Sequence, residues 1–154
     1  MAAYFLDSSA LVKRFSTESG SAWILGIVRP SLNNFLAIAT ITGAEVVSAL
    51  TRKLRGNKLS QRQYNNAIRR FEREFAIRYF GTDVTASLVE NAMSLAKRHG
   101  LRGYDSVQLA ACLIVADTRR FLNLSPIIFV SADNDLNIAA LAEGLKVENP
   151  NDHP

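Results

Sequence analysis

The chain has 154 residues, of which 48% are hydrophobic and 21% charged, a balance typical of one soluble globular domain and not of a disordered chain. Its longest apolar runs are too short to span a bilayer, and Asp7 interrupts the first of them, which argues against a secretory signal. We therefore expect a cytoplasmic protein. The only cysteine, Cys112, cannot form an internal disulfide and has no neighbouring Cys or His with which to bind zinc.

The formal net charge of +4 is concentrated in one segment. Nine Lys or Arg residues and only two Glu residues lie between positions 52 and 78, so this segment alone carries +7. A basic lobe on a chain that is slightly acidic elsewhere favours a polyanionic partner such as a nucleic acid. The alternative is that these charges only solvate the outer faces of two surface helices.

The first predicted element is a strand at residues 3–6, a continuous apolar run typical of a strand buried on both faces of a parallel sheet. Asp7 follows it directly. Two short helices are expected at 10–15 and 19–29, followed by a second buried strand at 35–39.

A helix is predicted to open at Thr42 and to end near Gly56. Thr42 and Glu45 have the spacing of a capping box, in which Glu45 would only satisfy the backbone amide of Thr42. The first turn of a helix that follows a parallel strand also lies at the carboxyl edge of the sheet. Glu45 could therefore point instead into a crevice near Asp7.

The second half of the chain continues the alternation of helices and strands. Ser60 begins a helix that completes a basic, partly aromatic helical hairpin over residues 46–77. A strand is predicted at 77–82, followed by Asp83 as an N-cap and by a helix with Leu88, Ala92, Leu95 and Ala96 buried. The remaining predicted elements are an apolar helix at 107–116, a strand at 126–131, a helix at 136–142, an edge strand at 145–147 and a frayed polar tail at 149–154. The fold class is therefore α/β, a three-layer α/β/α sandwich with a central parallel sheet, as a single domain over residues 1–148.

Four carboxylates are expected at one edge of this sheet, because right-handed crossovers place the strand-to-helix turns on the same side. They are Asp7, Glu45, Asp105 and Asp133. Each alone could simply cap or favour a helix N-terminus. Gathered together they would repel one another unless a cation offsets their charge. Oxygen ligands without placed His or Cys predict Mg²⁺ or Mn²⁺, and a pair of such ions suits phosphodiester hydrolysis.

Four segments, residues 4–13, the helix start at Glu45, residues 104–110 and residues 129–133, resemble the PIN-domain family, particularly the VapC-type toxins of bacterial toxin–antitoxin pairs. The resemblance implies a PIN-like fold and a Mg²⁺- or Mn²⁺-dependent endoribonuclease. It also implies a homodimer, held inactive by a cognate antitoxin whose tail enters the acidic groove.

By the same resemblance, the catalytic metal ligands would be Asp7, Glu45, Asp105 and Asp133. Ser8 and Ser131 would steady these ligands or a water molecule. Asp135 stands where the family often has a basic residue, and would either bind metal through water or cap the last helix.

Two alternatives within this family stay open: a solitary RNA-processing nuclease, and a non-catalytic module that binds RNA or protein. The complete acidic quartet argues against the second, because a degenerate member would be expected to lose a carboxylate. A receiver-type domain and a phosphatase with an Asp-x-Asp motif are both disfavoured, because Ser8 and Ser9 stand where further acidic residues would be needed after Asp7.

Overall fold

The computed structural model describes all 154 residues, which are organised around a five-stranded parallel sheet with the strand order β3-β2-β1-β4-β5. β1 (Ala3–Leu6) is central and pairs with β2 (Phe35–Ala39) on one side and β4 (Ile127–Val130) on the other. The edge strands are β3 (Phe80–Thr82) and β5 (Lys146–Glu148). The chain thus starts in the middle of the sheet and extends to both sides. The resulting switch point lies at the carboxyl ends of β1 and β4, where open α/β sheets bind ligands.

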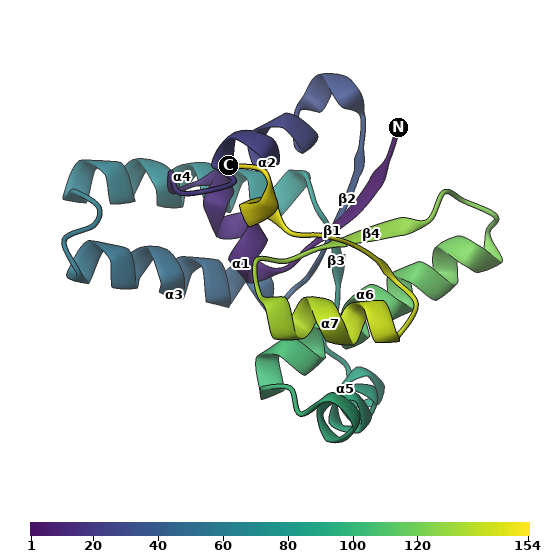
Figure 1. Cartoon of the computed structure of the whole chain (residues 1–154). Helices are drawn as coiled ribbons and strands as arrows, with labels where there is room; N and C mark the ends of the chain where they lie inside the picture. The colour runs from purple at the N-terminus through teal and green to yellow at the C-terminus, as the bar shows by residue number, and fades with distance from the viewer.

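Helices cover both faces of the sheet, as Figure 1 shows, and the three-layer α/β/α prediction is confirmed. One face carries Phe5 and Phe129, whose stacked rings lie 6.0 Å apart between their centroids. It packs against α5 (Ala86–His99), α6 (Gly103–Phe121) and α7 (Asn134–Ala142).

The other face of the sheet carries Leu6, Ile38 and Val130, which alternate with the first set along the same strands. It packs against α1 (Ser8–Leu11), α2 (Ser21–Ile27), α3 (Thr42–Arg55) and α4 (Gln61–Ile77). Burial on both faces explains why these strands are continuous apolar runs.

The predicted helical hairpin is present as α3 and α4, which lie side by side and project from the body of the molecule (Figure 1). Val46 and Leu50 of α3 and Phe71 of α4 are buried where the hairpin joins the body. Ser60 caps α4 through a complete capping box with Gln63, which accounts for the sharp start of this helix.

Several predicted boundaries differ from the structure. α4 runs to Ile77, whose side chain is 78% exposed, so β3 begins only at Phe80. The N-cap of α5 is Thr85, not Asp83, because the Thr85 hydroxyl accepts the hydrogen bond from the amide of Leu88.

Other elements are longer or shorter than predicted. α6 begins at Gly103 and ends at Phe121, beyond both predicted ends, because the polar residues on either side of the apolar run are helical too, and one of them, Arg119, is buried. The first predicted helix is divided into α1 and a 3₁₀ turn, η1 (Val12–Arg14). Ala96, predicted in the buried stripe of α5, is only half-buried.

The polar tail, predicted to be frayed, packs onto the domain. It forms a 3₁₀ turn, η3 (Pro150–Asp152), and Pro150 is buried. The imidazole of His153 stacks on the indole of Trp23 with 4.5 Å between ring centroids, and its Nε2 lies 3.0 Å from Glu148. Aromatic stacking and burial therefore hold the tail against α2. No helix of the molecule is both long and apolar enough to traverse a bilayer.

Candidate active site

A cavity of about 550 Å³ opens beside the carboxyl end of β1, between α1, α3 and the beginning of α6. Glu45 lines it from α3 and Asp105 lines it from α6. Arg52, Arg102 and Tyr104 also contribute to its walls. The same cavity therefore brings together two carboxylates and two guanidinium groups from distant parts of the chain.

Asp7 lies at the end of β1, next to this cavity but buried, with only 3% of its surface exposed. Its Oδ1 accepts hydrogen bonds from the amide of Ala10 (2.8 Å) and the hydroxyl of Ser9 (2.7 Å), and its Oδ2 accepts one from Ser131 (2.6 Å). Burial raises the pKa of Asp7 from 3.8 to about 6, although these hydrogen bonds oppose the rise. Asp7 is thus an N-cap and also an energetically strained carboxylate.

Glu45 does not form the capping box that its spacing allowed. The N-cap of α3 is Ile41, which makes no side-chain cap, and Thr42 is already the first helical residue. Both carboxylate oxygens of Glu45 are held from other elements instead: Oε1 accepts from Gln108 Nε2 at 2.8 Å and Oε2 accepts from the hydroxyl of Ser8 at 2.9 Å. The capping interpretation is therefore wrong, and the side chain is directed to the cavity.

Asp105 stands in the first turn of α6 and does not cap it, because the N-cap is Arg102. Burial raises the pKa of Asp105, and repulsion from Asp133 and Glu45 raises it further, while Arg102 lowers it. Asp133 caps α7 by accepting from the amide of Leu136 at 2.9 Å. Electrostatic coupling thus links three carboxylates that come from three different helix starts.

Asp135 lies in the first turn of α7 and is exposed. It takes no part in the hydrogen bonds that hold the other carboxylates, and it does not cap the helix, since Asp133 does.

The four carboxylates of the predicted quartet lie at one edge of the sheet but do not converge on a single point. They are Asp7, Glu45, Asp105 and Asp133. No three Asp, Glu, His or Cys side chains are close enough together to hold one metal ion in this conformation. None of the ion pairs in the structure involves these four residues. A set of carboxylate oxygens without ion-pair partners fits Mg²⁺ or Mn²⁺ chemically, whereas zinc sites in proteins are rich in His and Cys.

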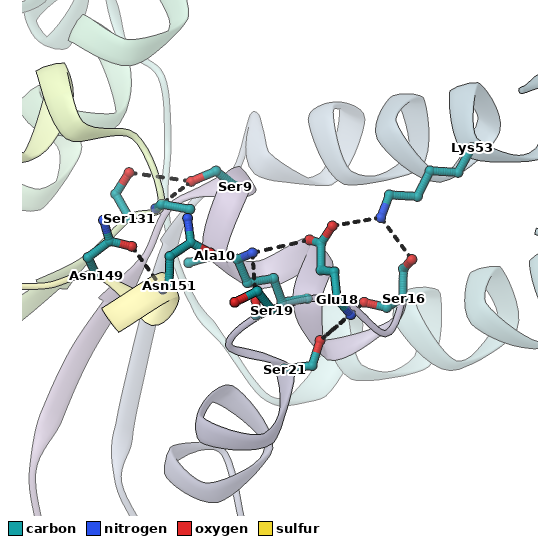
Figure 2. A network of polar contacts seen from close by, with 12 residues as sticks. Ser9, Ala10, Ser16, Glu18, Ser19, Ser21, Lys53, Ser131, Asn149 and Asn151 are labelled. Atoms are coloured by element: carbon teal, nitrogen blue, oxygen red, sulfur yellow. Dashed lines mark hydrogen bonds and ion pairs between the residues drawn. The ribbon is translucent and has the colours of Figure 1, made fainter. Parts of the chain in front are cut away.

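Hydroxyl groups connect the ends of β1 and β4. Ser131 donates to Asp7 and accepts from the amide of Asp133 at 3.1 Å. Ser9, which sequence reasoning missed, donates to Asp7 and accepts from the amide of Ala132 at 2.9 Å. Figure 2 shows the Ser9 and Ser131 hydroxyls next to each other. Their oxygen atoms lie 3.3 Å apart.

Gln108 was also missed. The available signal was a single polar residue within the most apolar predicted helix, directly before the apolar run at residues 109–112.

A second polar network, also visible in Figure 2, ties residues 16–21 to α3. Lys53 Nζ donates to Glu18 Oε2 and to Ser16 Oγ, both at 2.9 Å. Similarly, Glu74 pairs with Arg14 at 3.0 Å and with Arg70 at 3.4 Å. Part of the basic segment therefore stabilises the fold.

Comparison with known proteins agrees with this architecture. The family model of the PIN domain matches residues 4–143. The chain is 33% identical over 116 residues to Ribonuclease VapC45 of Mycobacterium tuberculosis, which covers 73% of this chain and 76% of that protein.

Two solved structures share the fold. One is a toxin–antitoxin complex from Klebsiella pneumoniae, with a TM-score of 0.59 and 17% identity over 96% of this chain and 97% of the other. The other is PAE2754 from Pyrobaculum aerophilum, with a TM-score of 0.61 and 20% identity over 96% of this chain and 92% of the other. Because the family model spans most of the sequence and a relative above 30% identity covers more than two thirds of it, this chain belongs to the PIN-domain family.

Proposed function

We propose that the protein is a metal-dependent endoribonuclease that hydrolyses RNA phosphodiester bonds as the toxin of a type II toxin–antitoxin pair. The observation that supports this most directly is the group of carboxylates at the switch point of the sheet, which no Lys or Arg pairs with, beside a cavity that also contains arginines. The similarity to Ribonuclease VapC45 favours RNA over other polyanions as the substrate.

The proposed metal ligands are Asp7, Glu45, Asp105 and Asp133, and Asp135 is a more distant candidate on the same helix start as Asp133. Burial is the main cause of the raised pKa values of Asp7 and Asp105, and repulsion from neighbouring carboxylates adds to it. A divalent cation would favour the ionised form of both groups. When bound, Mg²⁺ or Mn²⁺ would lower the pKa of an attacking water and stabilise the leaving oxygen.

The hydroxyl groups around the quartet have a positioning role in this proposal. Ser8 orients Glu45, while Ser9 and Ser131 orient Asp7. Because Ser131 also accepts from the backbone of Asp133, it ties the two strand ends together at the site.

Arginines around the cavity are the proposed contacts to the RNA backbone. Arg52 lies two turns beyond Glu45 on α3, and Arg102 precedes Asp105. Tyr104, 62% exposed, presents a ring on which an unpaired base can stack. Phosphate contacts of this type give affinity that falls with salt and little sequence preference.

The proposed partners are RNA, a cognate antitoxin and a second copy of the chain. The antitoxin is supported by the shared fold of the Klebsiella pneumoniae toxin–antitoxin complex. The homodimer follows from the family resemblance. We place the protein in the cytoplasm, where transcripts are accessible to it.

The test is cleavage of a structured RNA mixture by the purified protein with Mg²⁺, with Mn²⁺ and with EDTA. Wild type should cleave only with metal, and Asp7→Asn should not cleave. Asp117→Asn is the matched control, because Asp117 is an exposed carboxylate on α6 that pairs only with Arg120. Equal activity in wild type and Asp7→Asn, or cleavage in EDTA, would contradict the proposal. RNA binding without any cleavage would instead favour a non-catalytic module.

A further inference from the structure

Gln108 is a polar side chain inside the apolar part of α6. It is 1% exposed and is followed by Leu109, Ala110, Ala111 and Cys112, all buried. Burying an amide is unfavourable unless hydrogen bonds compensate for its lost hydration. Packing alone would favour Leu or Met at this position, so the hydrogen bonds of the amide must compensate for its burial.

The amide nitrogen of Gln108 makes two hydrogen bonds to the first turn of α3. It donates to Thr42 Oγ1 and to Glu45 Oε1, both at 2.8 Å. Since an ionised carboxylate can only accept, the NH₂ group must face Glu45. The amide oxygen is then left buried without a partner.

Both acceptors of the Gln108 amide belong to the first turn of α3, which carries Glu45. One of them is the Glu45 carboxylate itself, and the other, Thr42, fixes the amide relative to that turn. The side chain of Gln108 is therefore held against the part of α3 from which Glu45 projects.

Glu45 is held on its other side by the chain segment that carries Asp7. Ser8, which donates to Glu45 Oε2 at 2.9 Å, follows Asp7 directly. Gln108 lies one helical turn after Asp105 on α6. The two donors thus fix the Glu45 carboxylate relative to both Asp7 and Asp105.

We propose that Gln108 is a positioning residue that, together with Ser8 and Thr42, holds the Glu45 carboxylate in the orientation that binds the divalent cation. The inference rests on the proposed function only for the role of the ion. Hydrogen-bond partners that orient metal ligands typically change metal affinity by about 10–100-fold when they are replaced. Gln108→Met, which keeps the length of the side chain and removes its hydrogen bonds, should therefore weaken Mn²⁺ binding by about this factor.

Mn²⁺ binding, measured from the electron paramagnetic resonance signal of the free ion, tests the proposal without RNA. The proteins needed are wild type, Gln108→Met, Glu45→Ala and the double variant. Gln108→Met should weaken binding in the wild-type background and should have no further effect once Glu45 is Ala, because Gln108 acts through that carboxylate. Equal losses in both backgrounds, or an unchanged affinity in Gln108→Met, would overturn the proposal.

Cys112→Ala is the matched control, because Cys112 is fully buried on the same helix one turn further on and carries a free thiol. It should lower the Tm and leave Mn²⁺ affinity unchanged. A similar loss of Mn²⁺ affinity in Cys112→Ala and Gln108→Met would assign the effect to core packing and refute a positioning role.

A second readout needs no metal. In ¹⁵N-labelled, metal-free protein, the Gln108 side-chain amide protons should exchange slowly with solvent, and Glu45→Ala should accelerate their exchange and shift their resonances. If Glu45→Ala changed neither the chemical shifts nor the exchange rate of these amide protons, the proposal would be overturned. If the Mn²⁺ and amide results hold while the wild type cleaves no RNA, then the proposed function fails and the role of Gln108 stands.

Discussion

Replacing Asp7 by Asn should stabilise the metal-free protein at neutral pH while it removes metal-dependent cleavage. The pKa of Asp7 is about 6 in the folded protein and 3.8 as its ordinary value. Between these two values the folded state binds more protons than the unfolded state, so the free energy of unfolding decreases as pH rises through this window. At 1.36 kcal/mol per pKa unit the loss amounts to about 3 kcal/mol, and it is complete above pH 6.

An Asn side chain has the same size and shape as Asp and can occupy position 7 without carrying a charge. Its Oδ1 can still accept from Ala10 and Ser9, and its Nδ2 can donate to the Ser131 hydroxyl, which now accepts. The variant should therefore recover up to about 3 kcal/mol at pH 7, which corresponds to a rise of roughly 6–12 °C in Tm for a domain of this size. At pH 4 the difference from wild type should nearly vanish, because Asp7 is then protonated when folded.

Thermal unfolding followed by circular dichroism in EDTA, from pH 4 to pH 8, measures this difference directly. Asp117→Asn is again the control, since an exposed carboxylate on α6 should give a small Tm change at every pH. A Tm difference between Asp7→Asn and wild type that is the same at pH 4 and pH 7 would refute the reasoning. So would a variant that is less stable than wild type at pH 7.

Three further predictions test the cavity wall, the tail and the buried ion pair. Arg52→Ala should weaken RNA binding similarly for unrelated sequences and reduce the slope of log affinity against log salt by about 1, as measured in a salt titration. Gly20→Ala should lower the Tm, because Gly20 has φ of +82° and an added Cβ would lie 2.3 Å from the Pro150 carbonyl oxygen. An unchanged Tm would show that the tail does not pack closely against the start of α2. Glu74→Gln should cost about 3 kcal/mol in urea unfolding, because the nearly buried Arg14 loses its partner, and a cost below about 1 kcal/mol would place this pair among weak surface bridges.

The central strands could be predicted from sequence because their burial leaves a direct signature. β1, β2 and β4 lie between two helical layers, so every residue in them is apolar, and Asp7 and Asp133 mark their carboxyl ends. The short edge strand β3 was harder to place, because only Thr82 of its three residues is even half-buried and the apolar Ile77 belongs to the preceding helix.

The contacts that hold the candidate site could not be predicted in the same way. The capping-box spacing of Thr42 and Glu45 is a local pattern, whereas the hydrogen bond that actually holds Glu45 comes from Gln108, 63 positions away. Likewise Ser9 meets Ser131 across 122 positions of sequence. Such contacts depend on how β1, β4, α3 and α6 are juxtaposed, which residue spacing within one element does not encode.

The choice of donors around the quartet relates the fold to the proposed reaction. Hydroxyl groups and amides orient Asp7 and Glu45 without neutralising them, as Lys or Arg in ion pairs would do. Positioning by neutral donors leaves the negative charge of the carboxylates available for a ligand. Burial raises the pKa of Asp7 and of Asp105, so a cation at the site would also offset the cost of burying their charge. Addition of Mg²⁺ should therefore raise the Tm of wild type more than that of Asp7→Asn, since a ligand stabilises the state that binds it. Equal shifts in the two proteins would mean that the ion binds elsewhere.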